Sequence, residues 1–318
     1  MPSEFEIIKR FFDRPARHAL VGIGDDCALL RPDAGLELAV TTDTLIEGRH
    51  FLPGADAEAL GHKALAVNLS DLAAMGAAPR WATLALALPA ADERWLAGFA
   101  RGFFALAERH GVDLVGGDTT RSPLLTINIT ALGEVPAGVA MYRAGARPGD
   151  DIWVSGELGG AALALKQPGL AAQLPELAAR LHRPEPRVEL GERLRGLARA
   201  AIDLSDGLAG DLGHILERSQ VGAVVEYAAI PRPAAFERFR ELERDCVLSG
   251  GDDYELLFTA AQPQRRDIEA LSRELKIPLS RIGAIQPNAA AGAGKLVVLD
   301  AAGKPIAHRG GFDHFASG

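Results

Sequence analysis

Short apolar segments that run into glycine and aspartate are the feature that most constrains how this chain can fold. Residues 20–23 lead into Gly24-Asp25-Asp26, residues 36–42 into Asp43, and residues 114–115 into Gly116-Gly117-Asp118. Segments of helical periodicity, such as residues 57–75, lie between these strand-length segments. Strands that alternate with helices predict an α/β or α+β fold, with acidic motifs at the ends of the strands.

The same patterns locate the other elements. Asp92 and Gly111 are typical cap residues for a helix between them. We expect helices at residues 4–12, 57–75, 92–110, 161–166, 187–200 and 208–219 and from Pro263 onward, and strands at residues 36–42, 81–88, 114–115, 126–132, 151–155, 223–227, 255–259, 279–285 and 295–299.

The length of the chain predicts two domains. A chain of 318 residues is about twice the usual size of one domain. A second strand–glycine–helix pattern begins near Arg147-Pro148-Gly149-Asp150. We therefore expect an N-terminal domain at residues 1–148 and a C-terminal α/β domain at residues 149–318.

Composition excludes several classes of protein. A net charge of −8, from 42 acidic and 34 basic residues, argues against a nucleic-acid partner, which requires a basic surface. Two cysteines cannot form a disulfide framework, and we expect Cys27 to be a small buried residue. The chain has no apolar run of 18 residues and no secretory signal pattern at its start. We expect a soluble cytoplasmic protein without a membrane partner.

Six short motifs carry aspartate beside glycine or a hydroxyl residue. A single Asp-Gly pair is more often a surface turn, but six are harder to explain in that way. We place them at strand ends or on an exposed helical face. They are Gly24-Asp25-Asp26, Thr41-Thr42-Asp43, Ser70-Asp71, Gly116-Gly117-Asp118, Asp203-Leu204-Ser205-Asp206-Gly207 and Gly250-Gly251-Asp252-Asp253.

Convergence of these motifs would create a strongly negative pocket. Two unit charges about 4 Å apart repel by about 4 kcal/mol at an effective dielectric constant of 20, so such a pocket needs cations or raised pKa values. Ligands that are all oxygen atoms favour Mg²⁺ over Zn²⁺, and Mg²⁺ favours phosphate oxygens. The sequence therefore predicts several Mg²⁺ ions with a polyphosphate ligand, although it lacks a P-loop and a protein-kinase signature. The turn at residues 156–160 either binds a phosphate or is a plain tight turn.

Taken together and in order, the motifs resemble those of the thiamine-monophosphate kinases. The resemblance rests on Gly22-Ile23-Gly24-Asp25-Asp26, Thr42-Asp43-Thr44, Asn68-Leu69-Ser70-Asp71, Gly116-Gly117-Asp118-Thr119-Thr120, Asp203-Leu204-Ser205-Asp206-Gly207-Leu208, Ser249-Gly250-Gly251-Asp252-Asp253-Tyr254-Glu255 and Gly311-Phe312-Asp313-His314-Phe315. It implies ATP-dependent phosphorylation of thiamine monophosphate to thiamine diphosphate. It also implies the fold of aminoimidazole ribonucleotide synthetase, in which N-terminal ATP- and Mg²⁺-binding domains pair into a homodimer around a shared β-barrel.

The resemblance also assigns roles by position. Mg²⁺ would be held by Asp26, Thr41, Thr42, Asp43, Asp71, Asp118, Asp203 and Asp206; ATP would contact Gly117, Asp118, Arg143 and Ser205; and the thiamine phosphate would contact His50, Asp252 and Phe312. The family usually has glutamate at the position of Asp252, so a water-mediated contact is the alternative to a direct one there. Without the resemblance, His50 also fits a surface-loop histidine, Arg143 a surface charge and Phe312 the edge of a core.

No residue stands out as a covalent or general-base catalyst. The acceptor that the resemblance implies is already an ionised phosphate, so direct in-line transfer needs positioning and charge neutralisation rather than a base. Two alternatives stay open: an ATP-using synthetase of the same fold, and a non-catalytic binder of nucleotide or thiamine phosphate.

Overall fold

The chain divides into two compact units in a computed structural model that describes residues 3–170, 173–288 and 295–310. The N-terminal unit comprises Met1–Leu72 and Ala77–Gly138, and the C-terminal unit comprises Ala73–Gly76 and Val139–Gly318. The short segment 73–76 groups with the C-terminal unit because the backbone amide of Met141 donates to the carbonyl of Met75 at 3.1 Å, and Arg195 donates to the carbonyl of Gly76 at 3.0 Å. The expected boundary between residues 148 and 149 stays a prediction.

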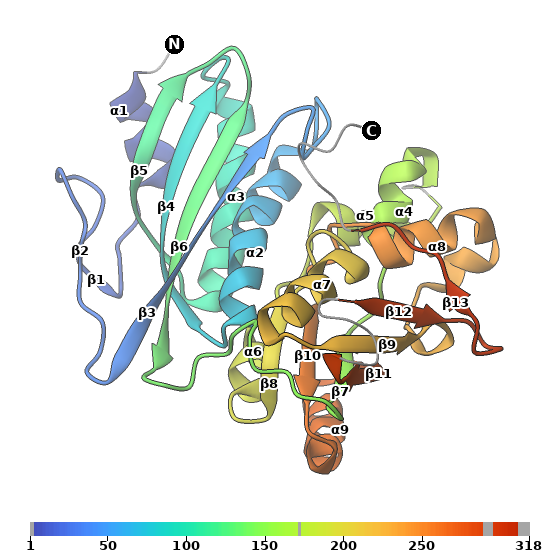
Figure 1. Cartoon of the computed structure of the whole chain (residues 1–318). Coiled ribbons are helices and arrows are strands. Elements are labelled where there is room, and N and C mark those ends of the chain that lie inside the picture. Colours follow the sequence, from blue (N-terminus) through green and yellow to red (C-terminus); the bar gives the residue numbers. More distant parts are fainter. Residues whose placement is uncertain (1–2, 171–172, 289–294, 311–318) are drawn as a thin grey trace. The chain divides into compact units, whose positions relative to one another are not determined.

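The N-terminal unit is built on a four-stranded sheet with the order β3-β6-β4-β5. β6 pairs antiparallel with both β3 and β4, whereas β4 and β5 are parallel. Figure 1 shows α2 and α3 on one face of this sheet. The elements are α1 (Glu4–Ile7), the π-helix η1 (Ile8–Phe12), β1 (Ala19–Val21), β2 (Leu29–Leu30), β3 (Leu36–Ile46), α2 (Ala57–Ala74), β4 (Ala78–Leu88), α3 (Glu93–His110), β5 (Asp113–Arg121) and β6 (Thr126–Pro136).

Helix α3 shows how local sequence sets the element boundaries in this unit. The carboxylate of Asp92 accepts hydrogen bonds from the amides of Arg94 and Trp95, which satisfies donors at the start of the helix. Gly111 ends the helix in the left-handed conformation, with φ 65°. Phe99 and Phe103 lie fully buried between these caps. Both predicted cap residues are confirmed.

The C-terminal unit contains a seven-stranded sheet with the order β13-β12-β9-β11-β7-β10-β8. Every neighbouring pair is antiparallel except β12 and β9. Its strands are β7 (Asp151–Ser155), β8 (Ala198–Asp203), β9 (Gly222–Glu226), β10 (Leu256–Ala260), β11 (Leu279–Gln286), β12 (Leu296–Leu299) and β13 (Pro305–Ile306). Its α-helices are α4 (Gly160–Lys166), α5 (Pro175–His182), α6 (Val188–Leu194), α7 (Leu208–Ser219), α8 (Arg240–Ser249) and α9 (Arg265–Leu275).

The helix expected at residues 187–200 is present, but its predicted end is wrong. Helix α6 ends at Leu194, Gly196 turns the chain with φ 79°, and β8 then runs to Asp203. The alanines of β8 favour a helix when they are considered alone. Pairing with β10 decides the outcome, because Ile202 lies opposite Leu257 and both side chains are buried.

Two acidic motifs lie inside strands rather than after them, which corrects the sequence-based placement. Strand β3 pairs with β6 from Leu36 through Ile46, so the segment Thr41-Thr42-Asp43 belongs to the strand. Strand β5 likewise continues through Gly116-Gly117-Asp118 to Arg121. Polar side chains are tolerated there because β3 and β5 are the edge strands of the sheet.

Helix α2 is more buried than its sequence suggests. Asn68 is fully buried, and its side-chain amide donates to the carbonyl of Ala64 at 3.1 Å. Asp71 is half-buried, so the face that carries these two residues is not exposed as expected. Among the described residues, no helix combines the length and apolar character needed to cross a membrane.

Candidate active site

In the N-terminal unit, β3 and α2 bring a hydroxyl group and a carboxylate together. The hydroxyl of Thr41 donates to a carboxylate oxygen of Asp71 at 2.5 Å. Side chains alternate along a strand, so Asp43 lies on the same face of β3 as Thr41. Thr41, Asp43 and Asp71 therefore gather on the α2 side of the sheet.

The opposite face of this sheet carries a second polar group. The hydroxyl of Thr42 lies 3.0 Å from that of Thr130, and the side-chain amide of Asn128 donates to Thr44 at 2.7 Å. Strand register aligns Thr44, Asn128 and Asp118 across the sheet through Ala85 of β4. Alternation thus separates Thr42 and Asp118 from the Thr41–Asp71 pair, although the sequence-based assignment includes all four in one metal set.

Gly117 is required by close approach of two strands. Its φ is 149°, and an added Cβ would lie 1.8 Å from the carbonyl oxygen of Leu84. Any side chain would push β5 away from β4. Strand packing therefore explains this glycine, and the ATP contact that the resemblance implies for Gly117 stays a prediction.

The loop after β1 holds Asp26 in an exposed position. Its backbone amide donates to the carboxylate of Asp25 at 2.9 Å, and Gly24 has φ 119°. Cys27 is exposed rather than buried, so that expectation is wrong. The turn geometry of an Asp-rich loop exposes the residue, and its small apolar side chain does not outweigh that geometry.

His50 has a structural role that its sequence did not indicate. It is half-buried in the turn after β3, and its Nδ1 accepts a hydrogen bond from the backbone amide of Ile46 at 3.0 Å. This bond requires Nδ1 to be unprotonated and orients the ring. His50 is therefore a fixed part of the β3 turn.

In the C-terminal unit, two motifs that are distant in the sequence form one structure, which we call the paired loops (residues 203–207 and 250–255). The amide of Asp252 donates to the carbonyl of Ser205 at 3.0 Å, and that of Tyr254 donates to Leu204 at 2.8 Å. The amide of Leu204 donates in return to Glu255 at 2.8 Å. Ser205, which is assigned to ATP, is thus in direct backbone contact with Asp252, which is assigned to thiamine phosphate.

Glycines allow the paired loops to touch. An added Cβ at Gly251 would lie 2.3 Å from the carbonyl oxygen of Ser205, and one at Gly207, whose φ is 103°, would lie 2.8 Å from the carbonyl carbon of Ser249. Asp252 and Tyr254 adopt left-handed conformations without being glycine, with φ 69° and 50°. Such conformations are costly for these residue types and cluster at functional sites.

Asp211 belongs to this acidic cluster and was missed by the sequence analysis. It lies in the first turn of α7, and its carboxylate accepts a hydrogen bond from the amide of Asp206 at 3.1 Å. Burial, followed by the charges of Asp203 and Asp206, raises the pKa of Asp211 to about 8. An acidic residue in the first turn of a predicted helix was the available signal.

The turn at residues 156–160 is occupied by a carboxylate of the chain itself. The amide of Gly159 donates to the carboxylate of Asp253 at 2.8 Å. Asp253 is half-buried, and the loss of water around its carboxyl group raises its pKa to about 8. Of the two open interpretations of this turn, the structure therefore favours the tight turn over a phosphate site.

The remaining predicted residues are less constrained. Ser205, Asp206 and Asp252 are half-buried, Asp203 is 4% exposed, and Arg143 is exposed on the surface of the C-terminal unit. Phe312 lies outside the described residues.

A cavity of about 630 Å³ lies beside Ser249 and Arg309. The hydroxyl of Ser249 donates to the backbone carbonyl of Arg309 at 3.2 Å.

The donor groups suit Mg²⁺ in an open site. In the part of the chain that the structure describes, no group of three acidic, histidine or cysteine side chains is close enough to hold a metal ion. Mg²⁺ usually takes only one or two carboxylates and completes its shell with water and substrate phosphates. The carboxylates of Asp203 and Asp206 and the Thr41–Asp71 pair are oxygen donors of this kind.

Comparison with known proteins gives a family match for both halves of the chain. Residues 24–135 match the model of the AIR synthase related protein, N-terminal domain, and residues 147–293 match that of its C-terminal domain. Thiamine-monophosphate kinase of Escherichia coli K12 is 46% identical over 328 residues, which covers 99% of each chain.

Solved structures give the same relationship. The crystal structure of thiamine-monophosphate kinase from Stenotrophomonas maltophilia K279a has a TM-score of 0.83 at 50% identity, covering 92% of this chain and 94% of that one. A structure of AaThiL complexed with AMPPCP and TMP has a TM-score of 0.77 at 29% identity, covering 90% and 89%. The resemblance in the motifs is confirmed, and the chain belongs to the thiamine-monophosphate kinases, with the mixed α/β two-domain fold of the AIR synthase related family.

Proposed function

We propose that this protein transfers the γ-phosphoryl group of ATP to thiamine monophosphate and forms thiamine diphosphate. The observation that carries the proposal is the paired loops, because backbone hydrogen bonds join the motif assigned to ATP and Mg²⁺ to the motif assigned to the acceptor. The substrates follow from relatives that match nearly the whole chain and from the related structure with AMPPCP and TMP.

Charge neutralisation is the main task of such a site, because donor and acceptor are both anionic. Bound Mg²⁺ would offset the negative charge of the phosphate groups. We propose that these ions are held by separate groups of oxygen atoms: those of Thr41, Asp43 and Asp71 on one face of the N-terminal sheet, those of Thr42 and Asp118 on the other face, and those of Asp26, Asp203 and Asp206. The hydrogen bond from Thr41 to Asp71 orients one of these carboxylates.

The other assigned residues position the two substrates. We propose that Gly117, Asp118, Arg143 and Ser205 contact ATP and that His50, Asp252 and Phe312 contact thiamine monophosphate. Asp252 is suited to orienting the acceptor because its backbone is fixed by Ser205 and its carboxylate accepts a hydrogen bond from the hydroxyl of Tyr254 at 3.1 Å. Fixed geometry of this kind accelerates a reaction between two bound groups.

Transfer is proposed to be direct and in line. The acceptor phosphate is already ionised near neutral pH, so no general base has to remove a proton. Cys246 is an unsuitable nucleophile, since burial raises the pKa of its thiol to about 11. The chain's own contribution is to bind, orient and neutralise the reacting phosphates.

Product analysis tests the proposal and separates it from its two alternatives. The protein is mixed with γ-labelled ATP, Mg²⁺ and thiamine monophosphate, and quenched samples are separated into protein and small molecules. We expect label in thiamine diphosphate, none on the protein without acceptor, and little on free thiamine. Unchanged ATP would indicate a non-catalytic binder, ATP use without thiamine diphosphate would indicate a synthetase, and a competent phosphoprotein would exclude direct transfer.

We further propose that two copies pair through the outer face of the N-terminal sheet and close a shared β-barrel. Leu38 and Val40 of β3 are 43% and 60% exposed on that face, although they are large and apolar. Light scattering should show a dimer that Val40→Glu weakens. Leu165→Glu, at a similarly exposed leucine of α4, is the control and should leave the dimer intact.

We also propose a cytoplasmic location. The two cysteines, Cys27 and Cys246, are both free thiols, which suits a reducing compartment. Fractionation of cells that produce the natural protein should recover it with cytoplasmic markers, and recovery with exported proteins would contradict this location.

A further inference from the structure

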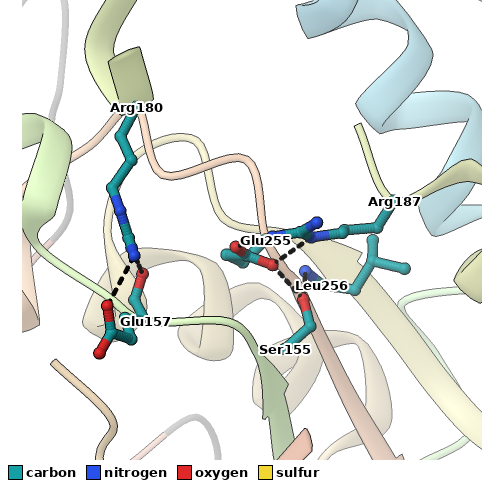
Figure 2. A network of polar contacts seen from close by, with 6 residues as sticks. All are labelled: Ser155, Glu157, Arg180, Arg187, Glu255 and Leu256. Carbon is teal, nitrogen blue, oxygen red and sulfur yellow. Dashed lines mark hydrogen bonds and ion pairs between the residues drawn. The ribbon is translucent and has the colours of Figure 1, made fainter. Parts of the chain in front are cut away.

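A partly buried ion pair joins Glu255 of the paired loops to Arg187 and takes no part in the chemistry proposed above. Arg187, at the start of α6, donates to both carboxylate oxygens of Glu255, at 2.7 and 2.5 Å (Figure 2). Ser155, the last residue of β7, donates to the same carboxylate at 2.5 Å and accepts the amide of Leu256 at 2.9 Å. Glu255 is 5% exposed, so its charge depends on these partners.

The backbone at Gly156 makes room for the carboxylate of Glu255. Gly156 has φ 59°, and an added Cβ would lie 2.0 Å from a carboxylate oxygen of Glu255. Burial disfavours the Arg187 cation, but the hydrogen bonds and charge of Glu255 outweigh that effect and raise the pKa of Arg187. Arg187 therefore stays charged and holds Glu255 in one orientation.

The position of Glu255 determines the position of residues 252–255, which we call the acceptor segment. The carbonyl of Glu255 accepts the amide of Leu204, and Asp253 is held by the amide of Gly159 at 2.8 Å. These two anchors flank Tyr254, which has φ 50°, and precede β10. Asp252, with φ 69°, is the first residue of this segment. Two left-handed residues persist only when neighbouring contacts hold them in place.

We infer that Arg187 is a positioning residue for the phosphate acceptor: through Glu255 it holds the segment 252–255 in the strained conformation that presents Asp252. The inference rests on the proposed function, in which Asp252 contacts thiamine monophosphate. Arg187 is suited to this task because its planar guanidinium fixes both carboxylate oxygens, whereas a lysine ammonium fixes a point charge only.

Arg187→Lys tests the inference, because it keeps the charge and removes the two-point contact. The KM for thiamine monophosphate should rise about tenfold, since a small displacement of a substrate contact has effects of this size or larger. The KM for ATP should change less than twofold and the Tm by a few degrees. A merely structural role would lower the Tm and the active fraction and leave both KM values unchanged.

The chain offers a matched control at the other end of β7. Arg265 donates to both carboxylate oxygens of Asp151, at 2.6 and 2.7 Å, and Asp151 is 1% exposed. Arg265→Lys therefore makes the same chemical change to a pair of the same kind, away from the paired loops. It should leave the KM for thiamine monophosphate within twofold of the natural value.

Hydrogen exchange provides a readout that does not depend on activity. The amides of Leu204, Asp252 and Tyr254 donate hydrogen bonds within the paired loops, so Arg187→Lys should speed their exchange and Arg265→Lys should not. Natural exchange rates and an unchanged KM in Arg187→Lys would overturn the inference.

Two further outcomes are separable. If Arg187→Lys does not fold, Arg187→Met combined with Glu255→Met is the alternative variant. It leaves no buried charge unpaired and is expected to fold. It should show the same rise in the KM for thiamine monophosphate, and a natural KM would overturn the inference. Absence of thiamine diphosphate formation by the natural protein would instead refute the proposed function, and accelerated exchange in Arg187→Lys would still establish the positioning contact.

Discussion

The acidic residues of the two units are arranged differently. In the N-terminal unit, Asp26 and Asp118 are exposed and Asp71 is half-buried beside a threonine hydroxyl. In the C-terminal unit, Asp211 is 2% exposed and Asp253 is half-buried, and each has its pKa raised to about 8. The first set is accessible to ligands, whereas much of the second supports the backbone.

An acidic motif is therefore not equivalent to a set of ligands. In Asp252-Asp253-Tyr254-Glu255, Asp253 accepts the amide of Gly159, and Glu255 is paired with Arg187. Only Asp252 of these three acids is a candidate for substrate contact. Substitutions should therefore impair catalysis at the acids assigned to ligands, and stability or positioning at Asp253 and Glu255.

Removal of divalent metal should have the largest effect. EDTA should abolish kinase activity and excess Mg²⁺ should restore it, because the phosphates and the exposed carboxylates repel one another without cations. Mg²⁺ with ATP should also raise the Tm, since a ligand that binds the folded state stabilises it. Full activity in rigorously metal-free buffer would contradict the role given to the N-terminal carboxylates.

Asp71→Asn should have the second largest effect, with a loss of about a hundredfold in kcat and little change in the Tm. Asp71 is the acid that Thr41 orients, so its charge is held in place for a ligand. Asp25→Asn is the matched control, because Asp25 is exposed and accepts only the adjacent Asp26 amide among the hydrogen bonds described for it. Equal, near-natural turnover in both folded variants would show that the metal assignment is wrong.

Glu255→Gln should reduce stability more than any substitution of an exposed acid in the same unit. It leaves the Arg187 cation buried without its anionic partner, which costs about 3–5 kcal/mol in free energy of unfolding. Glu274→Gln is the control, because Glu274 forms a similar two-point pair with Arg193 on the surface and should leave denaturant unfolding unchanged. Equal unfolding midpoints for the two variants would remove the contrast between buried and exposed acids.

Asp253→Asn should have the smallest effect near pH 4, where the carboxyl group of the folded protein is protonated, and its effect should depend on pH above that value. Burial raises the pKa of Asp253 from 3.8 to about 8, so the folded protein keeps a proton that the unfolded chain releases. This residue's contribution to the free energy of unfolding therefore falls as pH rises from about 4 to about 8. In denaturant unfolding, the free energy of unfolding of the asparagine variant should fall less over that interval than that of the natural protein. Identical pH profiles for the two proteins would indicate that the carboxyl group of Asp253 is charged.

The local sequence predicted those elements whose signals are short-range. The caps at Asp92 and Gly111, strand β7 and helix α7 are found at the predicted residues, because periodicity and capping act within one or two turns. The order of the motifs also identified the family, as the comparisons confirm. The first half of strand β8 was predicted to be the end of a helix, because its pairing with β10 is a long-range contact.

The sequence by itself therefore determined the α/β class, the family and the concentration of acidic groups near glycine. Only the tertiary structure decided which acids face outward and which hold the backbone. Asp252 and Asp253 are adjacent in sequence, yet one lies beside Ser205 and the other caps the turn at Gly159. The physical reason is that burial and hydrogen bonding depend on segments brought together by folding, and these contacts set the charge and orientation of each carboxyl group.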